Sequence, residues 1–139
     1  MGLILDTSVL VTAERNGRSV RQIFAQVLAA QGEQDPGLAA ITLLELEHGI
    51  ERAKLDSHRK RRQSFLDDLL ADIPVYPLTA EIARLAGKIS GQEAARGVTI
   101  PIEDLLIGAT ALHFGFEVLT ENVRHFQMIP NLAVRNLQP

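Results

Sequence analysis

Short apolar runs alternate with longer helical patterns along this chain, and that alternation constrains the possible folds more than any other feature of the sequence. The short runs, which we predict to be strands, cover residues 3–5, 38–41, 73–78 and 116–119, with a weaker candidate at 133–135. Strands that alternate with helices predict a parallel sheet covered by helices on both faces. We therefore predict an α/β fold with three α/β/α layers and a central, mostly parallel sheet of four to five strands.

Helices are predicted where apolar residues recur at helical spacing and where Gly or Pro marks an end. They cover approximately residues 20–31, 42–54, 58–71, 79–96 and 101–114. Gly97 and Gly115 end the last two, and Pro101 suits a first helical turn. The sequence contains no internal repeat or linker, and 139 residues are enough to bury a genuine core, so we expect a single domain over residues 1–139.

The composition excludes several classes of protein. There is no cysteine, so neither a disulfide framework nor a thiolate metal site is available. No apolar run reaches the roughly 18 residues that a membrane span needs, and the first residues lack the basic stretch and long apolar run of a secretory signal. A cytoplasmic protein without a membrane partner is the expectation.

Three carboxylates stand at the predicted starts of helices. In an open α/β sheet these starts lie near the carboxyl ends of the strands, where ligands bind. Asp6 follows the first strand, and Glu45 and Asp104 lie in the first turns of the helices predicted to begin at Thr42 and Pro101. Each has a structural explanation taken alone: Asp6 as a helix cap, Glu45 in a capping box with Thr42, and Asp104 as a partner of the helix dipole. If the helix starts meet, however, the carboxylates converge, and clusters of oxygen ligands favour Mg²⁺ or Mn²⁺.

Four stretches in the same order resemble the PIN-domain ribonucleases of the VapC toxin type, which belong to type II toxin–antitoxin systems. These stretches are LILDTSVL at 3–10, TLLELEHG at 42–49, IEDLLIGATAL at 102–112 and LTENVRHFQMIPNL at 119–132. The first three match in residue type and spacing, the fourth in its framework. The resemblance spans nearly the whole chain and implies a PIN-like fold.

The resemblance also implies a chemistry. The three central acids of the family fall on Asp6, Glu45 and Asp104, which would hold one or two Mg²⁺ or Mn²⁺ ions and activate a water for hydrolysis of an RNA phosphodiester bond. Ser8 is expected to orient Asp6 or a bound water. The expected partners are a transfer or ribosomal RNA substrate, a small VapB-like antitoxin bound through a helix in an apolar groove, and a second copy of the chain in a homodimer.

The fourth stretch departs from the acid-rich form of the family. Asn122 and His125 stand where many relatives have Asp, so we expect a weaker second metal site, with Asn122 still offering an oxygen. Glu121 is a candidate to compensate, and Thr120 is either a site hydroxyl or the cap of the next turn. The departure keeps an alternative open, namely a catalytically weak PIN-fold module that binds RNA or protein.

A basic stretch is the candidate RNA contact. The net charge of −3 argues against a nonspecific nucleic-acid coat, but residues 52–62 carry six Lys or Arg against a single acid, Asp56. Such a run is either a solvated helix face or a local phosphate-binding stripe. The residues expected to contact the RNA backbone are Arg59, Lys60, Arg61, Arg62 and, beside the acidic site, Arg124.

Overall fold

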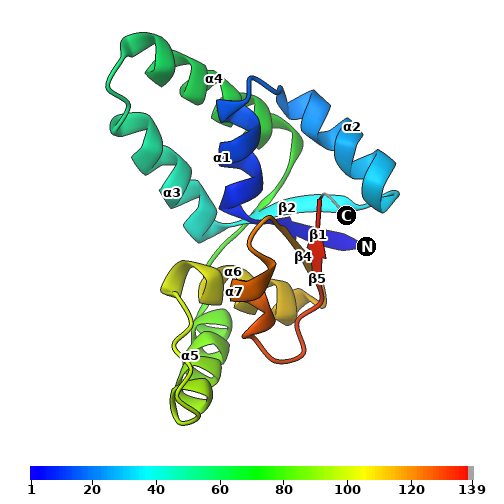
Figure 1. The fold of residues 1–139 in the computed structure, drawn as a ribbon, viewed down its shortest axis with the longest axis vertical. Helices are drawn as coiled ribbons and strands as arrows, with labels where there is room; N and C mark the ends of the chain where they lie inside the picture. The colour runs from blue at the N-terminus through cyan, green and yellow to red at the C-terminus, as the bar shows by residue number, and fades with distance from the viewer. Residues whose placement is uncertain (138–139) are drawn as a thin grey trace.

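A five-stranded parallel sheet forms the centre of the computed structural model, which describes residues 1–137 (Figure 1). The strand order is β3-β2-β1-β4-β5, and every pair of neighbouring strands is parallel. The strands are β1 (Gly2–Leu5), β2 (Asp35–Ala39), β3 (Val75–Tyr76), β4 (Glu117–Thr120) and β5 (Val134–Asn136). The predicted three-layer α/β/α fold with a central parallel sheet is therefore confirmed.

Seven helices connect these strands within the described residues. They are α1 (Thr7–Arg15), α2 (Val20–Gln31), α3 (Ala40–Glu51), α4 (Asp56–Asp72), α5 (Ala80–Ala94), α6 (Ile102–Phe114) and α7 (Val123–Gln127). Figure 1 shows α1 to α4 gathered on one side of the sheet and α5 to α7 on the other. None of the helices in residues 1–137 is both long and apolar enough to cross a membrane.

Alternation along β1 separates two hydrophobic cores. Leu3 and Leu5 pack with buried residues of α1, α2 and α4, whereas Ile4 packs with those of α5, α6 and α7. All three side chains are fully buried, which is the pattern of a central parallel strand covered on both faces. The short apolar run at the start of the chain is therefore long enough to anchor both layers.

Several element boundaries differ from the sequence-based expectation, and β3, for example, spans only Val75–Tyr76 rather than residues 73–78. The second strand spans Asp35–Ala39 rather than residues 38–41, because the backbones of the polar residues at its start pair with β1. As a result α3 begins at Ala40 instead of Thr42. The helix over 101–114 ends as predicted at Gly115, whose φ of 70° is a left-handed conformation that favours glycine.

The parallel arrangement brings the functional candidates to one edge. Because β1, β2 and β4 run in the same direction, their carboxyl ends lead into α1, α3 and the segment before α7 at the same edge of the sheet. The backbone N–H of Asp6 donates to the carbonyl of Leu119 at 2.9 Å, which ties the end of β1 to the end of β4.

Candidate active site

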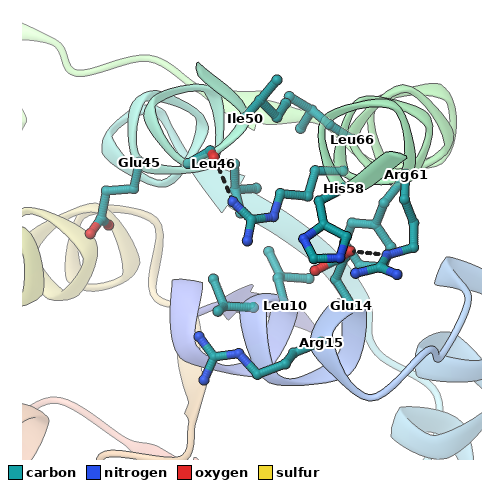
Figure 2. A pocket seen from close by; sticks show the side chains of 13 residues that line it. Leu10, Glu14, Arg15, Glu45, Leu46, Ile50, His58, Arg61 and Leu66 are labelled. Carbon is teal, nitrogen blue, oxygen red and sulfur yellow. Dashed lines mark hydrogen bonds and ion pairs between the residues drawn. The ribbon is translucent and has the colours of Figure 1, made fainter. Parts of the chain in front are cut away.

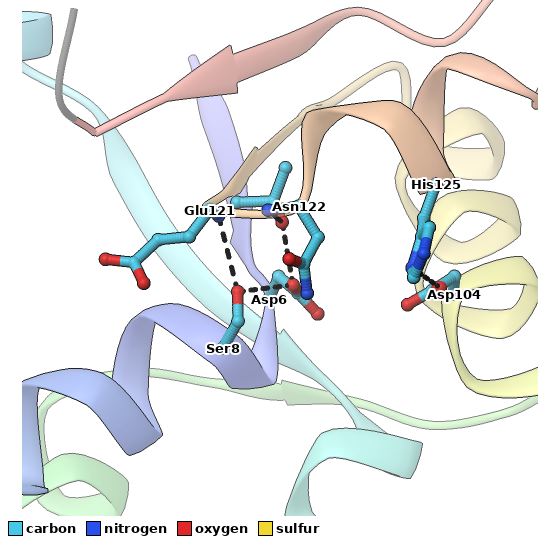
Figure 3. Close-up of polar contacts among 7 residues, drawn as sticks. Asp6, Ser8, Asp104, Glu121, Asn122 and His125 are labelled. Carbon is cyan, nitrogen blue, oxygen red and sulfur yellow. Dashed lines mark hydrogen bonds and ion pairs between the residues drawn. The ribbon is translucent and has the colours of Figure 1, made fainter.

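Asp6 lies at the end of β1 with only 3% of its surface exposed. It occupies the N-cap of α1, yet its carboxylate caps no helix amide. Instead Oδ2 accepts hydrogen bonds from the hydroxyls of Ser8 and Thr120, each at 2.7 Å (Figure 3). Two hydroxyls from different elements therefore set the orientation of this carboxylate.

Glu45 lies on α3 and is held by α1 rather than by its own helix. Its Oε1 accepts from the Thr7 hydroxyl at 2.8 Å. The capping box considered for Thr42 and Glu45 is wrong: the N-cap is Ala39, and Thr42 is a fully buried residue inside the helix. The helix begins two residues earlier than predicted because β2 ends at Ala39, before the end of the apolar run.

Asp104 lies in the first turn of α6, and His125 approaches it from α7. The Nδ1 of His125 is 3.0 Å from Oδ2 of Asp104, whose side chain is 14% exposed (Figure 3). The imidazole itself is half-exposed. His125 therefore pairs with the acidic site instead of adding negative charge to it.

Electrostatics show that these carboxylates share one environment. Burial raises the pKa of Glu45, and the negative charges of Glu103, Asp6 and Asp104 raise it further against the Thr7 hydrogen bond. Burial is also the main reason that the pKa of Asp104 is raised; Asp6 adds to the shift, and His125 opposes it. We call Asp6, Glu45, Glu103 and Asp104 the acidic cluster. Glu103, exposed beside Asp104, belongs to it through its charge.

The donor chemistry of the acidic cluster fits a divalent cation. In the described part of the chain no Lys or Arg forms an ion pair with any of its four carboxylates. Oxygen ligands with uncompensated negative charge are those that Mg²⁺ and Mn²⁺ prefer. Over residues 1–137 no three acidic or histidine side chains are yet arranged to hold an ion, so binding would need side-chain adjustment.

Of the residues around Asn122, some contact the Asp6 side of the acidic cluster and others point away from it. Glu121 does not bring its carboxylate to the cluster: Oε2 accepts from the Thr12 hydroxyl at 2.9 Å, and only the backbone N–H faces the site, donating to Ser8 at 3.3 Å (Figure 3). The backbone N–H of Asn122 donates to Thr120 at 2.8 Å. The Thr120 hydroxyl therefore bonds both Asp6 and the backbone that leads into α7, although the N-cap of that helix is Asn122.

The basic stretch lies mainly on α4, where several of its members have partners within the chain. Arg61 pairs with Glu14 at 2.8 Å, and Arg59 lies 3.9 Å from Asp56. The guanidinium of Arg62 donates to the carbonyl of Gly49 at 2.6 Å. Lys60 and, on α7, Arg124 are exposed. Among residues 1–137, Lys60 and Arg124 are thus the candidates whose charged groups face solvent without an ion pair inside the chain.

A pocket of about 350 Å³ lies between α1, α3 and α4 (Figure 2). Its walls combine apolar side chains with the Glu14–Arg61 ion pair, and Glu45 belongs to its lining. The apolar lining comes from Leu10, Val11, Leu46, Ile50, Phe65 and Leu66. The pocket therefore extends from the acidic cluster along α1.

Sequence reasoning missed two side-chain pairings. The Thr7 hydroxyl donates to Glu45, a pairing that the sequence analysis did not predict. The pairing of His125 with Asp104 was also not foreseen. In both cases the partners come from different elements, and the one available signal is that Thr7 and His125 lie within the four stretches that resemble the family.

Comparisons with known proteins agree with this geometry. Residues 3–130 match the PIN domain family. Ribonuclease VapC of Rickettsia bellii (strain RML369-C) is 32% identical over 134 residues, 96% of this chain and 95% of that protein. The tRNA(fMet)-specific endonuclease VapC of Shigella flexneri is 26% identical over 96% of each chain. The structure of VapBC2 from Rickettsia felis bound to a DNA fragment from their promoter matches with a TM-score of 0.82, 26% identity and 98% of both chains. The chain therefore belongs to the PIN domain family, in the VapC group of ribonucleases.

Proposed function

We propose that this protein is a metal-dependent endoribonuclease and the toxin of a toxin–antitoxin pair. The observation that carries the proposal is the acidic cluster, whose carboxylates come from the end of β1, from α3 and from α6 and have no Lys or Arg partner in residues 1–137. Burial and the neighbouring negative charges raise the pKa of Glu45 and of Asp104. The names of the relatives, ribonuclease and tRNA(fMet)-specific endonuclease, support the same chemistry.

Asp6, Glu45 and Asp104 are the residues that would hold Mg²⁺ or Mn²⁺. Such an ion acidifies a water and neutralises charge that develops on the phosphoryl oxygens. Ser8 and Thr120 keep the Asp6 carboxylate in one orientation. His125 lies against Asp104 with half of its side chain exposed, and we propose that it contacts an RNA phosphate there.

The direct test is cleavage of total RNA by purified wild type and by Asp6→Asn, each with Mn²⁺, with Mg²⁺ and with EDTA. We expect discrete fragments from the wild type alone and none in EDTA, because the variant loses a charged ligand but keeps an oxygen that Ser8 and Thr120 can bond. Cleavage that persists in Asp6→Asn would contradict the assignment. The fragment ends would identify the substrate, which we propose to be a transfer or ribosomal RNA.

The proposed partner is a small antitoxin, since the similar structure from Rickettsia felis is a VapBC complex. The pocket between α1, α3 and α4 suits an apolar side chain of a partner helix, and Glu45 in its lining suits a basic one. Val11 is 36% exposed in this wall. We expect Val11→Glu to abolish copurification with the coexpressed antitoxin while RNA cleavage in Mn²⁺ remains; retention of the complex would contradict this placement.

The remaining functional proposals concern RNA binding and assembly. Arg59, Lys60, Arg61, Arg62 and Arg124 are proposed to contact the RNA backbone, with the chain acting as one domain and as a homodimer in the cytoplasm. Light scattering of the antitoxin-free protein tests the dimer, because a mass of 15.2 kDa would indicate a monomer.

A second candidate function is a PIN-fold module that binds RNA or protein with little catalysis. Asn122 and His125 favour it, because neither adds a carboxylate to the acidic cluster. Binding of RNA by the wild type with no cleavage in Mn²⁺, after a copurifying antitoxin has been removed, would support this module over the nuclease.

A further inference from the structure

Two buried or half-buried hydroxyls form a chain that ends on Glu45. The Thr7 Oγ1 is 2.8 Å from Glu45 Oε1 and 3.1 Å from Thr42 Oγ1. A hydroxyl has one proton and two lone pairs, and an ionised carboxylate only accepts. Thr7 therefore donates to Glu45 and accepts from Thr42, whose hydroxyl is fully buried and needs a partner. The order of donation is Thr42 to Thr7 to Glu45.

These two hydrogen bonds oppose the forces that would move the Glu45 carboxylate out of the acidic cluster. Glu45 has a long side chain on α3, and like charges on Asp6, Glu103 and Asp104 repel it. No Lys or Arg in the described residues holds it in place. A hydrogen bond from a neutral hydroxyl to a carboxylate is charge-assisted, and it fixes direction as well as favouring the ionised form.

The hydroxyls of the site bond two different carboxylates, those of Asp6 and Glu45. Ser8 and Thr120 both bond Asp6, and neither contacts Glu45. Thr7 bonds Glu45 across the junction of α1 and α3. Loss of Thr7 would therefore leave Asp6 oriented and release Glu45 alone.

We propose that Thr7 is a positioning residue for Glu45: its hydroxyl, held by Thr42, keeps the Glu45 carboxylate within the acidic cluster as a ligand for a divalent cation. The inference deepens the proposed nuclease function and rests on it. Thr7 touches neither substrate nor ion in this scheme, and its effect reaches the cation through Glu45.

The test compares Mn²⁺ binding by Thr7→Val, which keeps the shape and removes the hydroxyl, and by Thr7→Ser, which keeps the hydroxyl. Free Mn²⁺ is counted by electron paramagnetic resonance on antitoxin-free protein, without RNA. We expect Thr7→Val to weaken Mn²⁺ binding roughly tenfold, the order expected for a hydrogen bond to a charged group, and Thr7→Ser to stay within about twofold of the wild type. RNA cleavage at limiting Mn²⁺ should fall in parallel and recover at high Mn²⁺.

Thr12→Val is the matched control, because Thr12 lies on the same helix and also donates to a carboxylate, that of Glu121 outside the acidic cluster. It should bind Mn²⁺ as the wild type does. Wild-type affinity in Thr7→Val, or equal weakening in Thr7→Val and Thr7→Ser, would overturn the positioning role.

The design separates failure of this inference from failure of the nuclease proposal. If the wild type neither binds Mn²⁺ nor cleaves RNA, the metal nuclease itself is wrong. If Thr7→Val does not give a folded protein by circular dichroism, Thr42→Val carries the test, since it removes the donor that holds Thr7. A loss of about two- to threefold in Mn²⁺ affinity in Thr42→Val supports the hydrogen-bond series from Thr42 through Thr7 to Glu45, and unchanged affinity contradicts it.

Discussion

The negative charges of the acidic cluster destabilise the metal-free fold. The same charges would favour the binding of a cation. Burial and mutual repulsion raise the pKa of both Glu45 and Asp104 above the values of an unfolded chain. For each group, the folded state holds more protons than the unfolded state at a pH between the pKa of the unfolded chain and the raised pKa of the folded protein. The free energy of unfolding therefore falls as pH rises through that window. The penalty is complete above the raised pKa and absent below the unfolded one.

Glu45→Gln should therefore stabilise the metal-free protein at neutral pH. In EDTA at pH 7 we expect a melting temperature on the order of 2 °C higher than that of the wild type, because the amide carries no charge and can still accept from Thr7. The difference should shrink toward pH 4. Differential scanning fluorimetry across pH measures it.

The exposed Glu47, on the same helix, provides the control for that experiment, and Glu47→Gln should leave the melting temperature nearly unchanged. Addition of Mn²⁺ should stabilise the wild type more than Glu45→Gln, since the variant lacks a ligand charge. A Glu45→Gln protein less stable than the wild type in EDTA would show that its hydrogen bonds outweigh the repulsion.

Asn122 offers a second test at the scale of one residue. Its backbone donates to Thr120, which in turn donates to Asp6, so the position lies next to the cluster. Asn122→Asp adds a carboxylate beside the acidic cluster. We expect tighter Mn²⁺ binding by roughly threefold to tenfold, from calorimetric titration, and a lower melting temperature in EDTA. Unchanged affinity would mean that the side chain at this position does not reach the ion.

At the scale of elements, packing between β2 and β3 depends on the absence of a side chain at Gly37. A Cβ at this position would lie 2.5 Å from the Tyr76 ring and 3.5 Å from the Pro74 carbonyl oxygen. The Tyr76 ring also packs against Phe114 and Phe116, with centroid distances of 4.7 and 5.6 Å, so it has little room to move. The glycine thus sets how closely these aromatic residues cover the sheet.

Gly37→Ala should lower the free energy of unfolding by about 1–3 kcal/mol through overpacking, measured by urea denaturation. The matched control is Gly87→Ala in α5, where a Cβ meets nothing within 4 Å. There the better helix propensity of alanine should raise the stability by up to about 1 kcal/mol. Equal stabilities of the two variants would contradict the packing of Tyr76 over Gly37.

At the scale of the whole molecule, the acidic cluster is assembled from both halves of the fold. Asp6 comes from the central strand, Glu45 from the layer of α1 to α4, and Asp104 from the layer of α5 to α7. α3 contacts both α1 and α6, which closes the cluster across the edge of the sheet. The pocket lies wholly within the first layer, so a partner that fills it reaches the cluster from the side of Glu45.

The basic stretch of α4 adds to the positive charge of the protein surface. Its contribution to RNA binding should be seen in the salt dependence of the affinity. Replacing Arg59, Lys60, Arg61 and Arg62 together with Gln should weaken RNA binding and reduce the slope of log affinity against log salt, by about 0.7 for each phosphate that the protein no longer neutralises. Filter binding at a series of salt concentrations measures the slope.

Lys60→Gln alone isolates a cation that faces solvent, whereas Arg61 and Arg62 also hold α4 to neighbouring elements. Replacement of Arg21, Arg84 and Lys88, exposed cations outside the stretch, is the control and should change the slope little. An equal change per charge in both sets would reduce the stretch to a solvated helix face.

Much of the fold could be predicted because its signals are local. The run at 3–5 is apolar at every position, as a strand covered on both faces requires, and Gly115 ends α6 through its own backbone preference. β2 was placed too late, because Asp35 and Pro36 lack the apolar character of a strand and belong to it only through pairing with β1. α7 was foreseen only as a short turn, since its five residues show no helical period.

The sequence by itself determined the alternation of strands and helices and the three acids that follow or begin its elements. Only the tertiary structure decided which hydroxyl holds which carboxylate. Thr7 bonds Glu45 across 38 residues and Thr120 bonds Asp6 across 114, whereas Glu121 turns toward Thr12. The physical reason is that these hydrogen bonds depend on the strand order β2-β1-β4, which brings distant segments to one edge and which no local propensity encodes.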